Sequence, residues 1–123
     1  MNGQCRENGV LDYDFENDSL FFNNNKSKFD ISIDLGDLIV DIGEDGVPIG
    51  VELLNASKHL KVSKIALRND IKVVEANVEI SEKEIEVKIS VFVESRNKLT
   101  EAVSILYGLN DVNLQPGQTA LVC

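Results

Sequence analysis

Apolar and polar residues alternate along most of the first half of the chain, which is the pattern of half-buried β-strands. Near its centre, two apolar runs flank Asp45-Gly46. Asp-Gly between such runs is a strong hairpin signal, because glycine adopts a positive φ without steric cost. The pattern predicts an antiparallel meander of five short strands with one apolar and one acidic face, at residues 10–16, 19–22, 29–35, 38–42 and 47–54.

The period changes after the fifth strand. Asn55 is a favourable helix N-cap, and residues 56–60 are typical of a helical turn. A stripe of basic residues at three- and four-residue steps follows, and it either binds phosphate or pairs with the acidic half of the same or a neighbouring chain. We favour the pairing. The stripe consists of Lys58, Lys61, Lys64, Arg68 and Lys72.

The second half carries another strong alternation, over residues 71–94, which predicts a long β-hairpin with one apolar face. The hairpin cannot bury that face alone, so we expect it to pack on the helices or to extend the first sheet. A helical stripe of apolar residues comes next, and Gly108 suits the position after a helix end. It predicts a helix over residues 98–107, with a short final strand at 120–122. The residues of the stripe are Leu99, Ala102, Val103, Leu106 and Tyr107.

These elements predict an α+β fold: an antiparallel β-meander with a short middle helix, a second long β-hairpin and a C-terminal helix. At 123 residues the chain is expected to be one domain, 1–123, with a meander plus helix at 10–60 and an extension at 61–123. The long hairpin and the exposed sheet edges favour a homodimer, formed through a sheet edge or an apolar face.

Two clusters of residues resemble the small uncharacterised YuzE-like family over residues 13–60. One is a tyrosine–acidic start followed by an aromatic strand, and the other is an acidic turn with glycine that leads into Gly-Val-Glu-Leu-Leu-Asn-Ala-Ser-Lys. The resemblance implies a small α+β fold and no catalytic residues. The matching residues are Tyr13, Asp14, Asp18, Ser19, Leu20 and Phe21, then Asp45, Gly46 and the run Gly50 to Lys58.

Charge is distributed unevenly between the two halves. The net charge is −9, and residues 1–57 hold 12 acids and 3 bases whereas residues 58–123 hold 9 of each. An acidic surface repels nucleic acid and anionic membranes and attracts a basic protein. The sequence has no apolar stretch of membrane-spanning length and a polar amino terminus, so we expect a cytoplasmic protein that binds neither nucleic acid nor membrane.

Few residues indicate chemistry. Cys5 and Cys123 have no metal-ligand spacing, and free thiols on loose ends are expected, with an intermolecular disulfide formed after purification as the alternative. His59 is the only histidine and no partner is marked by spacing, so no catalytic residue and no cofactor are predicted. Carboxylates on one sheet face are candidate ligands for Ca²⁺ or Mg²⁺, although a solvated face is the more common outcome. They are Asp12, Asp14, Glu16, Asp30, Asp34, Asp41 and Glu52.

Three functions fit these observations. The first is a non-enzymatic interaction module whose acidic face docks a basic protein, by analogy with antitoxins. The second is a self-associating structural protein. The third is a protein that depends on a divalent metal held by the acidic face.

Overall fold

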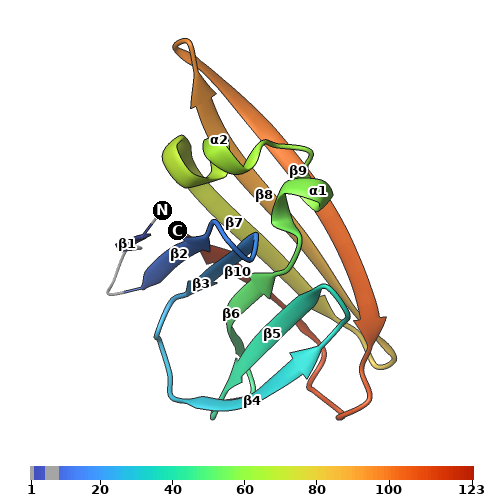
Figure 1. The fold of residues 1–123 in the computed structure, drawn as a ribbon. Helices are drawn as coiled ribbons and strands as arrows, with labels where there is room; N and C mark the ends of the chain where they lie inside the picture. Colours follow the sequence, from blue (N-terminus) through green and yellow to red (C-terminus); the bar gives the residue numbers. More distant parts are fainter. Residues whose placement is uncertain (1, 5–8) are drawn as a thin grey trace.

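A computed structural model describes residues 2–4 and 9–123. Two antiparallel sheets pack against each other, and two short helices connect them in the chain (Figure 1). The elements are β1 (Asn2–Gln4), β2 (Val10–Asp14), β3 (Ser19–Asn23), β4 (Phe29–Asp34), β5 (Leu38–Gly43), β6 (Pro48–Leu53), α1 (Ala56–Leu60), α2 (Lys64–Asn69), β7 (Ile71–Ile80), β8 (Glu84–Ser95), β9 (Lys98–Leu109) and β10 (Gly117–Val122).

The five strands predicted in the first half are present, but their order in the sheet is not that of a meander. The six-stranded sheet runs β1-β2-β3-β6-β5-β4. After β3 the chain passes across the sheet, so that β6 pairs with β3 and β4 lies at the edge. Burial explains this order, because the side chains of β6 are almost all buried and those of β4 almost all exposed. A central strand needs apolar residues, whereas an edge tolerates the two aspartates of β4.

One hydrophobic core lies between the sheets. The inward residues of β2, β3, β5 and β6 meet those of β7, β8 and β10. The alternation predicted these inward faces, but the long hairpin was expected to pack on the helices or to extend the first sheet, and it instead belongs to a second sheet packed against the first. Leu20, Leu38 and Leu53 are fully buried on the first sheet, and Val87 and Ile89 on the second. The long hairpin predicted at residues 71–94 is confirmed as β7 and β8, and the short final strand as β10.

The predicted helix over residues 98–107 is wrong, because this segment is the strand β9. Arg96 and Asn97 both have positive φ, 52° and 62°, which is the conformation of a tight two-residue hairpin turn. The turn sets Lys98 opposite Ser95 and begins a ladder with β8 that continues to Leu109. The spacing of Ala102 and Leu106 fits one face of a helix and also fits one face of a strand. The hydrogen-bonded ladder with β8 makes this segment a strand.

The helical segment also differs in detail from the expectation. It is two helices, α1 and α2, separated at Lys61, which has a positive φ of 56°. Asn55 was expected to cap α1, but its side chain makes no capping hydrogen bond. Ser63 caps α2, and its Oγ accepts a hydrogen bond from the Ala66 amide at 3.1 Å.

The expectation of a free thiol on a loose end is wrong for Cys123. This residue is disulfide-bonded, and its backbone is ordered by two hydrogen bonds to Val74, of 2.7 and 2.8 Å. The end of β10 is therefore held against β7. Cys5 lies outside the described residues.

The turn between β8 and β9 provides a test of the strand. Asn97→Val should lower the free energy of unfolding by about 1–2 kcal/mol, because a β-branched residue opposes positive φ, and Asn97→Gly should at least preserve it. Chemical denaturation measures both. Lys98→Val, at the neighbouring exposed strand position, is the control and should change stability by less than about 0.5 kcal/mol. Equal stability of the Val and Gly variants at Asn97 would contradict the turn.

Candidate functional site

The outer face of the six-stranded sheet carries most of the acidic candidates. One row of directly paired residues crosses five strands, from β2 to β4. Carboxylates alternate in it with two partly exposed apolar residues, in the order Asp12, Phe21, Glu52, Ile39, Asp34. We call the outward residues of β2, β3, β6, β5 and β4 the acidic face. Asp14 and Asp41 also belong to it.

No basic residue lies at an outward position of these five strands. Their remaining outward residues are uncharged: Val10, Ser19, Asn23, Gly50 and Ser32. The two other predicted candidates lie beside this face. Glu16 is exposed in the β2–β3 turn, and Asp30 is exposed on β4 next to a bulge.

The carboxylates of the acidic face lie apart from one another. Strands are spaced by about 4.8 Å, and in the central row an apolar residue separates each carboxylate from the next. Several also have their own hydrogen-bond donors. Ser19 Oγ donates to Glu52 Oε2 at 2.6 Å, and Ser32 Oγ donates to Asp41 Oδ1 at 2.8 Å. Within the described part of the chain, no three acidic, histidine or cysteine side chains form a group that could hold a metal ion.

Asp18 is the most connected carboxylate, and it lies in the turn between β2 and β3. Its Oδ1 accepts from the Tyr13 hydroxyl at 2.6 Å and from the Ser57 amide at 3.0 Å. Its Oδ2 accepts from Ser57 Oγ at 2.6 Å. Asp18 therefore caps the start of α1 from a distant strand turn, in the place where Asn55 was expected to act.

The environment of Asp18 shifts two pKa values. Burial alone would raise the pKa of Asp18, but the hydrogen bonds from Ser57 and Tyr13 outweigh it and hold this pKa below its usual range. Burial raises the pKa of Tyr13, and the hydrogen bond to Asp18 raises it further. The tyrosine thus stays a neutral donor to an ionised carboxylate. All three side chains are satisfied by one another, as in a structural network.

Several charged residues make contacts around the helices. His59 Nε2 lies 2.8 Å from Asp37 Oδ2, and this contact holds the pKa of Asp37 below its usual range. Two residues of the basic stripe cover the Phe15 ring, with Lys64 Nζ 4.6 Å and Arg68 Cζ 4.4 Å from its centroid. Part of the basic stripe thus packs against the acidic half of its own chain.

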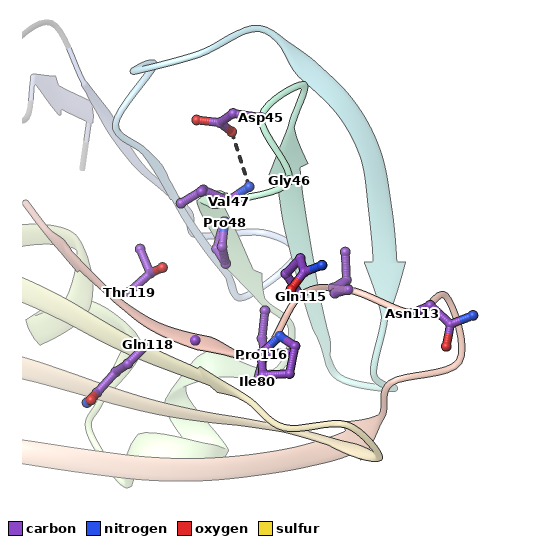
Figure 2. Close-up of a pocket in the computed structure, with 12 residues that line it drawn as sticks. Asp45, Gly46, Val47, Pro48, Ile80, Asn113, Gln115, Pro116, Gln118 and Thr119 are labelled. Atoms are coloured by element: carbon purple, nitrogen blue, oxygen red, sulfur yellow. Dashed lines mark hydrogen bonds between the residues drawn. The ribbon is translucent and has the colours of Figure 1, made fainter.

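A pocket of about 380 Å³ lies where the β5–β6 turn meets the first half of β10 and the segment before it (Figure 2). Val47 and Pro48 come from the first side, and Pro116 and Thr119 from the second. The carboxylate at its rim, Asp45, accepts a hydrogen bond from the Val47 amide at 3.1 Å. A second pocket, of about 430 Å³, lies beside β4 and the end of β9. Neither pocket is lined by a lysine, arginine or histidine.

Sequence reasoning singled out the acidic face but missed the role of Asp18. The signal was present, because Tyr13, Asp18 and Ser57 all belong to the residues that carry the family resemblance. Asp18 and Ser57 are 39 residues apart in the chain, so no local sequence pattern indicated their contact. Close packing explains why position 50 is a glycine, because an added Cβ would lie 2.9 Å from the Phe22 carbonyl oxygen.

Comparison with known proteins places these residues in a family. Residues 11–57 match the profile of a family described as "Protein of unknown function (DUF2283)". The chain belongs to this family. The match confirms the resemblance stated for residues 13–60. No solved structure matches the chain.

Two relatives match the chain well beyond that segment. A protein of Methanosarcina mazei named "Putative hypoxanthine phosphoribosyltransferase" is 46% identical over 103 residues, which are 84% of this chain and 83% of that protein. The "Uncharacterized protein MJ0789" of Methanocaldococcus jannaschii is 33% identical over 111 residues, 90% of this chain and 96% of that protein. The second half of the chain is thus shared with relatives of similar length.

Replacing the buried carboxylate tests the Asp18 network. Asp18→Asn keeps the shape and tolerates the positive φ of 54° at this position. It should lower the free energy of unfolding by roughly 2–3 kcal/mol, because charge-assisted hydrogen bonds are lost. Thermal and chemical denaturation at neutral pH measure the change. Asp41→Asn, with one exposed hydroxyl partner, is the matched control and should cost less than about 0.5 kcal/mol.

The pH dependence of the same variants gives a second readout. The folded pKa of Asp18 is lower than the unfolded value near about 3.9, so its contribution is complete above that value and is lost as pH falls through the folded pKa. Unfolding of the wild type should therefore become easier with acid more steeply than that of Asp18→Asn. Parallel curves for the two proteins would contradict an ionised, hydrogen-bonded Asp18.

Proposed function

We propose that this protein is a non-enzymatic interaction module whose acidic face docks a basic protein partner. The observation that carries the proposal is the composition of that face, where five carboxylates and no basic residue occupy the outward positions of β2 to β6. Phe21 and Ile39 lie between the carboxylates and offer apolar contact area at the centre. A partner with basic residues around an apolar strip fits this alternation.

The uneven charge of the chain supports the same conclusion. The excess of acids lies in residues 1–57, which contain the acidic face. Long-range attraction to a basic surface speeds association and makes it sensitive to salt. The proposal includes a homodimeric, cytoplasmic protein, as expected from the sequence.

A second candidate comes from the name of the Methanosarcina mazei relative, "Putative hypoxanthine phosphoribosyltransferase". A phosphoribosyl donor carries several negative charges, and such groups are bound by basic side chains, metal ions or the amides of long helices. The two pockets lack basic side chains, and the helices α1 and α2 have five and six residues. We therefore prefer docking of a basic protein to phosphoribosyl transfer as the function. Incubation of the purified protein with hypoxanthine and a phosphoribosyl donor, followed by detection of the nucleotide, tests the alternative.

The third reading is a metal-dependent protein that uses the acidic face. The number of carboxylates on one sheet face supports metal binding. The spacing between strands argues against metal binding, because it keeps these carboxylates apart. Titration of the metal-free protein with Ca²⁺ or Mg²⁺, followed by calorimetry, separates it from docking.

Neutralising the acidic face should abolish docking. The variant Asp12→Asn/Asp34→Asn/Glu52→Gln removes three charges from the central row, and we expect it to capture basic partners from cells of its source at least roughly tenfold less well than the wild type. Affinity capture at low and high salt with mass spectrometry of the bound proteins measures this. The matched control is Glu79→Gln/Glu82→Gln/Glu84→Gln, which removes three exposed charges from the hairpin of β7 and β8 on the other side of the molecule's core. Equal losses with both triple variants would contradict a specific role of the acidic face.

A further inference from the structure

Strand β9 forms one edge of the four-stranded sheet, whose order is β10-β7-β8-β9. Its twelve residues pair with β8. Within the part of the chain that the structure describes, residues 98–109 make no backbone hydrogen bond outside this ladder. Figure 1 shows β9 along the side of the molecule with no strand beyond it. Such an edge is a template for pairing with another strand.

The free backbone groups and the exposed side chains of β9 belong to the same residues. The Asn110 amide donates to the Lys83 carbonyl at 2.9 Å, and the register between β8 and β9 is unbroken. In an antiparallel ladder hydrogen-bonded residues alternate, so the even-numbered residues of β9 bond to β8 and the odd-numbered ones direct their amides and carbonyls outward.

Five of these six odd-numbered residues are large and apolar, and the sixth is Glu101. Helix α1 contacts β9 but leaves their side chains open to solvent. A row of exposed apolar side chains therefore lies along the unpaired edge. The exposed fractions are 55% for Leu99, 41% for Val103, 48% for Ile105, 57% for Tyr107 and 66% for Leu109.

We propose that a second copy of this chain pairs antiparallel with β9, so that the four-stranded sheet continues into the sheet of the partner. A two-fold axis at Ser104 sets every odd-numbered residue opposite an odd-numbered residue of the partner, and the free backbone groups of both strands then meet. The inference is independent of the acidic face, which lies on the other sheet.

The side chains of β9 are complementary to themselves in this register. Leu99 faces the partner's Leu109, and Val103 faces the partner's Ile105. Glu101, the one carboxylate of the strand, faces the partner's Tyr107, which is uncharged at neutral pH. No pair of like charges is formed. Apolar cross-strand pairs stabilise a sheet, and like charges directly opposite destabilise it.

Two of the other edge strands, β4 and β10, have features that oppose the same pairing. A two-fold axis at Ser32 of β4 would set Asp30 opposite the partner's Asp34, which places like charges together. Strand β10 has only six residues. Strand β9 has twelve residues, no proline and a single carboxylate, so it lacks the usual protection of an edge against association.

Sedimentation velocity of the full chain over a concentration series reaching about 1 mM tests the proposal. The wild type should form a dimer, and Ile105→Lys should weaken it at least roughly tenfold, because the variant places an ammonium group on the apolar edge of each copy. Val122→Lys, an equally exposed apolar residue on the outer face of β10, is the control and should leave the dimer unchanged. A wild type that stays monomeric overturns the proposal. A dimer that both variants weaken equally, or that neither weakens, also overturns it.

A mixing experiment tests the register. The chain with Ile105→Lys is combined with a chain carrying Val103→Glu, so that the introduced ammonium and the introduced carboxylate face each other across the proposed axis. We expect a heterodimer that is tighter than either homodimer by native mass spectrometry. A mixture that associates no better than the separate variants would overturn pairing about Ser104.

Discussion

The carboxylate of Asp18 connects β2, near the start of the first sheet, to α1, where the chain leaves that sheet. Tyr13 reaches it from β2, and Ser57 reaches it from α1 with both its amide and its hydroxyl. The Asp18 backbone carbonyl accepts a further hydrogen bond from the amide of Ala56, which is fully buried. The helix therefore begins where this turn places it. Because a buried charge is costly without donors, all of these contacts must form together.

This network gives a structural role to several residues that carry the family resemblance. Tyr13, Asp18 and Ser57 hold the turn and the helix, while Ser19 and Glu52 join two neighbouring strands across the outer face. Each has a partner from within the same set. These contacts therefore stabilise the fold of the segment that matches the family.

The second half of the chain supplies what the family segment lacks. The strands β2 to β6 form one layer with an apolar inner face, and a single layer leaves that face in water. Strands β7, β8 and β10 cover it, and both relatives share this part of the chain. The outer faces then differ, because one sheet presents spaced carboxylates and the other presents apolar residues along an open edge. The two surfaces therefore differ in chemistry.

The amino-acid sequence alone determined the local elements of this protein, because alternation of apolar and polar residues is read within a few residues. The alternation predicted the strands β2 to β8 and their inward faces. The sequence also indicated the acidic character of one outer face and the resemblance to the family. It did not determine which strands are neighbours, so the position of β4 at the edge and the pairing of β3 with β6 were missed. Residues 98–107 fit two periods equally well, and only the ladder with β8 made them a strand. The contact of Asp18 with Ser57 likewise depends on the packed structure, because distant residues meet only when the chain has closed on its core.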